Sequence, residues 1–160
     1  MHTSRRALLF LGLAGALAGC SGARADRRAA KALAASEPPL YPNETPELRL
    51  LINQYADFYD VPRELVHKVI IRESTHRPWA RNDPYMGLMQ IHPNTARGMG
   101  YQGTPEGLLD AETNLTYAVK YLRGAWLVSD GSYDAAVGWY ARGYYYEAKR
   151  RGLLEETGLI

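Results

Sequence analysis

Apolar residues recur at helical spacing from about residue 46 onward. Thr45-Pro46-Glu47 has the capping threonine, the first-turn proline and the early acidic residue that are typical of a helix start. Apolar positions three or four residues apart follow this start, as expected for one face of a helix. These positions are Leu48, Leu51, Ile52 and Tyr55. The pattern therefore predicts that the first helix of a folded unit begins at residue 46.

A second apolar stripe follows Asp60-Val61-Pro62 and leads to a glutamate. Its members are Val61, Leu65, Val69 and Ile70. Glu73 stands four residues after Val69, so we expect the helix to project this carboxylate from its apolar side, near its C-terminal end. Partial burial and the negative end of the helix dipole both disfavour the ionised form, which predicts a raised pKa for Glu73. Glycoside cleavage requires an acid that stays protonated near neutral pH. The alternative for Glu73 is a surface position, because most glutamates at helix ends are surface residues.

Two further helices are expected toward the C-terminus. The first has Asp110 as its N-cap and a stripe that includes Leu115, Ala118, Val119, Leu122 and Trp126. The second starts near Asp134 and carries Ala136, Val137, Trp139 and Tyr140. We expect the tail from Glu147 to Ile160 to finish this last helix and then to fray after Gly152.

The first 45 residues lack this periodicity. Arg5 and Arg6 precede an apolar run over residues 7–18, which is too short to cross a bilayer and ends in Leu-Ala-Gly before Cys20. This ending resembles the bacterial lipoprotein signal, which implies a signal peptide over residues 1–19 and lipidation of Cys20. Residues 20–45 are rich in alanine, arginine and proline, so we expect a disordered tether. We expect residues 46–160 to form the folded domain.

Composition restricts the function classes. The 160 residues are 46% apolar and 22% charged, as in an ordinary single-domain globular protein. Removal of the signal would reduce the 19 basic residues to 17, against 17 acidic ones, which argues against nucleic acid as a partner. A single cysteine excludes an internal disulfide and a cysteine-based zinc site. The histidines lack the His-Glu-x-x-His spacing, so we predict no metal and no cofactor.

Four sequence motifs carry a family resemblance. They are Ile71-Arg72-Glu73-Ser74, Gly87-Leu88-Met89-Gln90-Ile91, Asn114-Leu115 with Tyr121-Leu122, and Tyr140 with Gly143. In this order and spacing, from Leu50 to Gly143, they resemble the soluble lytic transglycosylases, which share the goose-type lysozyme fold. The resemblance implies a mainly α, lysozyme-like α+β domain. In such a domain a short loop or small β region lies around the active-site cleft.

The resemblance also implies a mechanism with one carboxylate. Glu73 would protonate the oxygen of the β-1,4 bond between N-acetylmuramic acid and N-acetylglucosamine in peptidoglycan, while the N-acetyl group of the substrate stabilises the cation. Glu73 would then act as the base that takes the proton of the C6 hydroxyl. The C6 oxygen closes on the anomeric carbon and gives a 1,6-anhydromuramic end without consuming water.

Other matched positions receive roles by the same resemblance. Ser74 would hold the end of the helix, and its alternative is a simple cap. Gly87 would let the backbone approach the sugar closely. Met89 and Gln90 would line the cleft, Met89 through apolar contact and Gln90 through hydrogen bonds near Glu73. For Asn114 and Tyr121, a structural role is at least as well supported as a ligand contact.

Two segments depart from the family pattern. The family usually has a serine near Asn82 that orients the N-acetyl group, and asparagine can form hydrogen bonds there with a different reach. The family also has an asparagine between the tyrosine and the glycine of Tyr140-Ala141-Arg142-Gly143. Here Ala141 or Arg142 stands in its place, and we expect Arg142 to bring a positive charge near the muramyl lactate or stem-peptide carboxylates. Tyr140 would direct its hydroxyl toward Glu73 or the sugar, or else be a core tyrosine with a solvated tip.

The expected location follows from the residue after the lipidated cysteine. Ser21 in place of aspartate favours, by resemblance to lipoprotein sorting rules, the periplasmic face of the outer membrane. Peptidoglycan strands and the membrane, through Cys20, are the expected partners, and no protein partner is visible. Two alternatives remain open: a lysozyme-type hydrolase with Asp83 as its second acid, and a non-catalytic peptidoglycan-binding scaffold.

Overall fold

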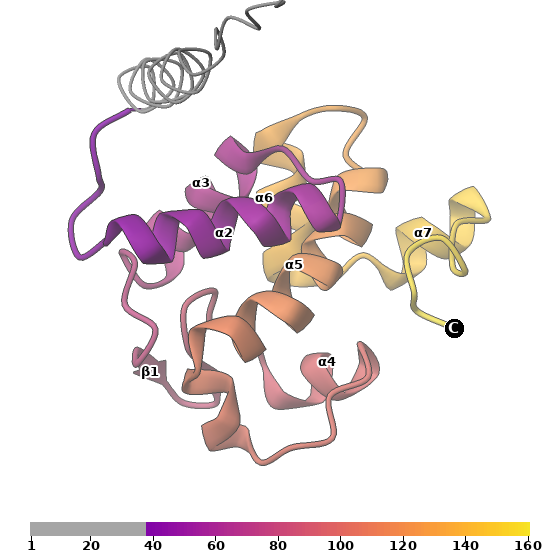
Figure 1. Ribbon diagram of the computed structural model, residues 1–160. Helices are drawn as coiled ribbons and strands as arrows, with labels where there is room; N and C mark the ends of the chain where they lie inside the picture. The colour runs from indigo at the N-terminus through magenta and orange to yellow at the C-terminus, as the bar shows by residue number, and fades with distance from the viewer. Residues whose placement is uncertain (1–37) are drawn as a thin grey trace, which may run out of the picture. The chain divides into compact units, whose positions relative to one another are not determined.

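The computed structural model describes residues 38–160 (Figure 1). This part of the chain forms six α-helices, one short 3₁₀ helix and one two-stranded antiparallel sheet. The expected fold class, mainly α with a small β region, is therefore confirmed. The predicted signal peptide, Cys20 and most of the predicted tether lie outside the described residues. None of the described helices has the length and apolar character needed to cross a bilayer.

The first two helices, α2 (Pro46–Phe58) and α3 (Arg63–Glu73), pack against each other. The predicted start of α2 is confirmed, because the Thr45 hydroxyl accepts a hydrogen bond from the backbone N–H of Leu48 at 3.2 Å. The predicted apolar stripe of α3 is confirmed as well, since Leu65, Val69 and Ile70 are fully buried. α3 ends at Glu73, so the end of this helix fixes where the carboxylate lies.

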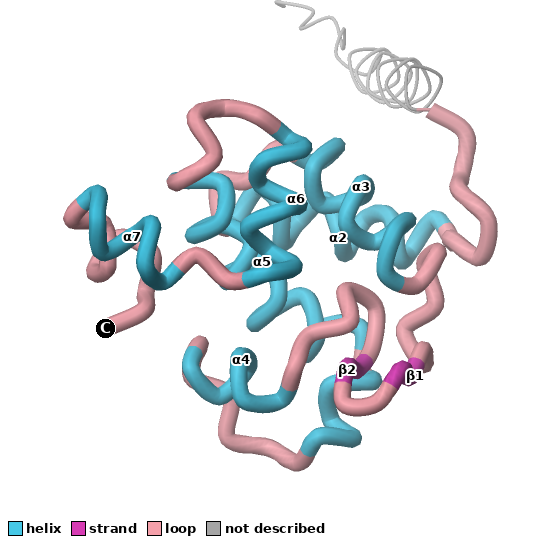
Figure 2. The backbone as a smooth tube through the Cα atoms, turned by 180° about the vertical axis from the view of Figure 1, so that it is seen from behind, coloured by secondary structure: helices cyan, strands magenta, loops and turns pink. Residues whose placement is uncertain are grey.

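A small hairpin follows α3. Strands β1 (Arg81–Asn82) and β2 (Tyr85–Met86) pair antiparallel, with Asn82 opposite Tyr85 (Figure 2). The chain then turns back, and Met86 pairs with Ile91 in an isolated bridge. The short helix α4 (Pro93–Gly98) and the 3₁₀ helix η1 (Pro105–Leu109) lead on to the longest helix of the domain.

Helix α5 (Ala111–Leu127) forms the centre of the core, where it contacts α2, α4, α6 and η1. Its predicted N-cap is confirmed, because the Asp110 carboxylate accepts from the backbone N–H of Thr113 at 2.8 Å. Its apolar stripe is fully buried, as predicted, at Leu115, Ala118, Val119 and Leu122. Helix α6 (Tyr133–Arg142) packs against α5 and contacts α3.

The C-terminal segment differs from the expectation. Gly143, at φ +88°, separates α6 from a further helix, α7 (Tyr145–Arg151). The chain does not fray after Gly152, because the backbone N–H of Leu153 donates to the Ala148 carbonyl at 2.8 Å and Thr157 is buried. The leucines of this segment pack against the core in a turn conformation, and this contact with the rest of the fold holds the end of the chain in place.

The expected domain start at residue 46 is also too late. The Asn43 amide donates to the Thr75 carbonyl at 2.9 Å, and Glu44 is only 7% exposed. The folded unit begins near Leu40. A buried glutamate requires partners from elsewhere in the fold, and the sequence pattern does not show them. The pattern therefore assigns a charged residue such as Glu44 to the tether.

Candidate active site

A pocket of about 670 Å³ opens beside the C-terminal end of α3. Its walls come from the end of α3, the β1–β2 hairpin and the turn after it, the start of α4, Tyr121 of α5 and the end of α6. Among the described residues, Glu73 is the only carboxylate that lines it. The domain therefore presents a single acidic side chain in a pocket large enough for sugar units.

Glu73 is half-buried, with 23% of its side chain exposed. Burial raises the pKa of its carboxyl group, and the positive charge of Arg72 partly opposes the change. The Arg72 Nε atom lies 3.4 Å from the Glu73 Oε1 atom. The pKa of Glu73 is thus raised, as the helical pattern predicts, and desolvation is the main cause of the increase.

Ser74 fixes the end of α3 from inside the protein. Its side chain is buried, its Oγ donates to the Leu88 carbonyl at 2.6 Å, and the same Oγ accepts from the backbone N–H of Arg77 at 3.2 Å. The Arg77 Nε atom also donates to the Ser74 carbonyl at 2.7 Å. Ser74 therefore links the end of α3 to the turn at residues 87–90. This role goes beyond that of a local helix cap.

Gly87 stands where two backbone segments meet. It has φ +76°, and a Cβ atom there would overlap the Leu108 carbonyl oxygen and the Asn114 amide. It does not line the pocket. The close approach that requires a glycine is therefore to η1 and α5, whereas we expected an approach to a sugar.

Asn114 holds the same turn from α5. Its side chain is fully buried, and its Oδ1 accepts from the backbone N–H of Met89 at 2.9 Å. Its Nδ2 donates to the carbonyls of Met86 at 2.9 Å and of Leu108 at 2.8 Å. The structural role considered for Asn114 is confirmed, because every one of these bonds goes to the backbone.

The two turn residues expected in the cleft have different positions. Gln90 lines the pocket, and its Nε2 donates to the carbonyls of Ala80 and Gly87 at 3.0 and 2.8 Å. The Met89 side chain is fully buried in the core and does not line the pocket. Periodicity cannot assign the face of a residue in a turn, and the bonds to Asn114 direct Met89 inward.

Tyr140 connects the pocket wall to this turn. Its hydroxyl donates to the Met89 carbonyl at 2.9 Å, and its ring meets Tyr121 edge-on with 5.4 Å between centroids. Burial, followed by the charge of Glu73, raises the pKa of Tyr140 well above its usual range. Tyr140 is therefore a protonated donor that lines the pocket. Asn82, on β1, also lines the pocket and is exposed.

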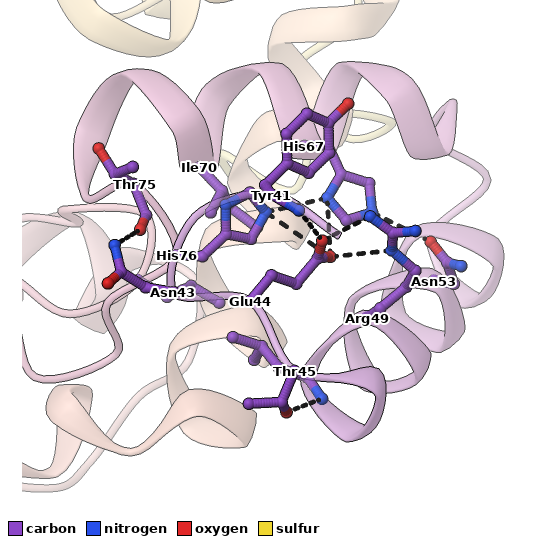
Figure 3. A network of polar contacts seen from close by, with 12 residues as sticks. Tyr41, Asn43, Glu44, Thr45, Arg49, Asn53, His67, Ile70, Thr75 and His76 are labelled. Atoms are coloured by element: carbon purple, nitrogen blue, oxygen red, sulfur yellow. Dashed lines mark hydrogen bonds and ion pairs between the residues drawn. The ribbon is translucent and has the colours of Figure 1, made fainter. Parts of the chain in front are cut away.

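Sequence reasoning missed a buried polar cluster that brings together residues before α2, on α3 and after α3 (Figure 3). Glu44, His67 and His76 bring donor atoms within 4.8 Å of one another. The His67 Nδ1 atom lies 3.1 Å from the His76 Nε2 atom and 3.6 Å from the Glu44 Oε1 atom. No spacing motif connects these residues, since Glu44 precedes α2 and His76 follows α3.

The cluster resembles a metal site in geometry, but an arginine already pairs with its carboxylate. Arg49 donates to both Glu44 oxygens, at 3.1 Å from Nε and 2.5 Å from Nη2. Burial lowers the pKa of His67 to about 4 and lowers the pKa of His76, so both rings are neutral near neutral pH. A divalent cation would add to the buried charge of Arg49, which is unfavourable. We interpret the cluster as an ion pair between Glu44 and Arg49 of α2 whose carboxylate also contacts His67 of α3, and the absence of a metal stays a prediction.

Comparison with known proteins places most of this domain in one family. A family model described as a transglycosylase SLT domain matches residues 50–152. The matched region contains Glu73 and every described element of the pocket wall. No significant match is found among curated proteins or among solved structures.

Proposed function

Because the chain belongs to the transglycosylase SLT domain family, we propose that it is a peptidoglycan lytic transglycosylase whose catalytic acid and base is Glu73. The family match confirms the resemblance that the four sequence motifs indicate. The observation that carries the proposal is that one half-buried carboxyl group with a raised pKa is the only acid lining the pocket in the described part of the chain.

In the first step, protonated Glu73 donates its proton to the glycosidic oxygen between N-acetylmuramic acid and N-acetylglucosamine. The bond from the anomeric carbon to this oxygen breaks, and the N-acetylglucosamine side leaves with the proton as its 4-hydroxyl. The N-acetyl oxygen of the muramyl unit stabilises the cation on the same sugar. Asn82, which lines the pocket from the exposed hairpin, donates a hydrogen bond to that N-acetyl group in the proposed mechanism.

In the second step, the Glu73 carboxylate takes the proton of the muramyl C6 hydroxyl. The C6 oxygen then bonds to the cationic anomeric carbon and gives a 1,6-anhydromuramic end, while the proton from the C6 hydroxyl leaves Glu73 protonated again. Ser74 and Tyr140 act through position, since each binds a backbone carbonyl of the turn at residues 87–90. Water consumption is not required at any step.

For the hydrolase alternative, no second acid from residues 38–160 lines the pocket. Asp83, the candidate named from sequence, is exposed in the hairpin turn and does not line the pocket. An inverting hydrolase requires a second carboxylate to activate water on the opposite face of the sugar. The pocket therefore favours the transglycosylase.

We further propose, from the sequence pattern at Cys20, that a lipid holds the enzyme at the periplasmic face of the outer membrane.

Mass spectrometry of digested peptidoglycan tests the function. Purified full-length protein should release anhydromuropeptides, Glu73→Gln should release none, and Glu156→Gln should behave like wild type. Glu156 is an exposed glutamate that does not line the pocket of Glu73, so it controls for the same chemical change. Reducing-end products would indicate the hydrolase. Intact sacculi with folded, bound wild-type protein would indicate the scaffold.

A further inference from the structure

The pocket wall carries more positive charge than its one carboxylate balances. Four arginines line it together with His92, and they are Arg72, Arg77, Arg81 and Arg142. The whole chain is close to balanced, with 19 basic and 17 acidic side chains. The excess of positive charge is therefore a local property of the pocket.

Two of the four arginines interact with other groups of the protein. Arg72 faces Glu73, with 3.4 Å between Nε and Oε1, and Arg77 donates from Nε to the Ser74 carbonyl at 2.7 Å. Both are within four residues of Glu73 and serve the end of α3. Their guanidinium groups have bonding partners in the absence of a ligand.

The other two arginines have no such partner. Within residues 38–160, neither Arg81 nor Arg142 makes an ion pair or a side-chain hydrogen bond, and both are exposed. The Arg142 guanidinium lies over the ring of Trp139, 3.9 Å from the ring centroid. Stacking restrains the plane of the guanidinium and leaves its N–H edge available for a bidentate partner.

We propose that Arg81 and Arg142 form a carboxylate-binding wall that makes the enzyme select anionic glycan strands over neutral ones. The two side chains come from different elements, β1 and α6, and line the same pocket as Glu73. The inference rests on the proposed function and adds the chemical class of the preferred substrate. The carboxylate belongs either to the lactyl group of a peptide-free muramyl unit or to the stem peptide of a substituted one.

Binding measurements in a Glu73→Gln background separate this inference from catalysis. The probes are a neutral chitooligosaccharide, a peptide-free muramyl glycan and a peptide-bearing glycan of the same length, titrated calorimetrically into the full-length protein. Arg81→Gln and Arg142→Gln are compared with Lys149→Gln, which removes one charge from an exposed position outside the pocket. Thermal denaturation of each variant verifies that it is folded.

We expect each pocket variant to weaken binding of an anionic glycan about tenfold, the effect of one partly exposed charge-assisted hydrogen bond. Binding of the chitooligosaccharide and all binding by Lys149→Gln should stay unchanged. The preference for anionic glycan should shrink when salt is raised from about 0.05 to about 0.5 M, because screening weakens exposed pairs. Arg142→Lys should recover only part of the affinity, since lysine keeps the charge and loses the planar fork.

The three probes also identify the source of the carboxylate. Tight binding of the peptide-free glycan indicates the lactyl group, and tight binding of the peptide-bearing glycan alone indicates the stem peptide. Equal binding of all three probes, or an equal loss for all three in the pocket variants, would overturn the proposal. Such a result leaves the transglycosylase function intact if wild type still produces anhydromuropeptides, so the two failures are distinguishable.

Discussion

Replacement of Asn114 by alanine is the sharpest test of how the fold supports the pocket. The substitution leaves the backbone N–H of Met89 and the carbonyls of Met86 and Leu108 without their side-chain partner. Each buried polar group left unpaired costs about 1–3 kcal/mol. Some relaxation and water entry are expected in the space vacated, so we predict a loss of about 3–5 kcal/mol in the free energy of unfolding.

This loss is a large share of the stability of a domain of this size, which is typically about 5–15 kcal/mol. Urea denaturation followed by circular dichroism measures it directly. Asn94→Ala is the matched control, because the exposed Asn94 side chain accepts only from Arg97, at 3.0 Å, and its loss should cost under about 0.5 kcal/mol.

Activity gives the second readout for Asn114→Ala. The turn at residues 87–90 carries Gln90 and the carbonyl that Tyr140 binds, so we expect a lower rate of anhydromuropeptide release even where the variant is folded. A stability loss below about 1 kcal/mol with wild-type activity would refute the reasoning, because it would mean that the three bonds do not hold the turn.

Three further predictions test other parts of the fold. Burial lowers the pKa of His67 to about 4 in the folded state, so the unfolded chain binds its proton first as pH falls below about 6.5. The contribution of neutral His67 to the free energy of unfolding is complete above that pH and should decrease by up to about 3 kcal/mol toward pH 4. Denaturation curves taken across this range should show a smaller loss of stability with falling pH for His67→Gln than for wild type. Gly87→Ala should cost about 2–4 kcal/mol by thermal denaturation, since its Cβ overlaps the Leu108 carbonyl, and a neutral result would contradict the close approach. Ser74→Ala should cost about 1–3 kcal/mol and lower turnover, because the Leu88 carbonyl loses its donor; unchanged turnover would show that this bond does not position the site.

Local signals explain what could be predicted. The caps at Thr45 and Asp110 and the apolar stripes of α2, α3 and α5 are encoded within a few neighbouring residues. The same stripes place Glu73 on the apolar side of α3, at its end, and partial burial there raises its pKa. These features follow from signals between residues that are close in sequence.

Contacts between distant residues explain what could not be predicted. Met89 turns into the core because Asn114, 25 residues later, holds its backbone N–H. Glu44 is buried because Arg49 and two histidines from beyond α2 surround it. Periodicity shows which face a helix buries, but it does not show which partners satisfy a buried polar group.

By itself, the sequence determined helices α2, α3, α5 and α6, the family motifs and the acid at the end of α3, since each depends on short-range spacing. The tertiary structure alone decided which side chains form the pocket wall. Arg81 and Arg142 are 61 positions apart in the chain, and only the packing of α6 beside the end of α3 brings both to the pocket that contains Glu73. The charge of that pocket is therefore a property of the folded chain, because it depends on which charges share a surface and not on how many the chain contains.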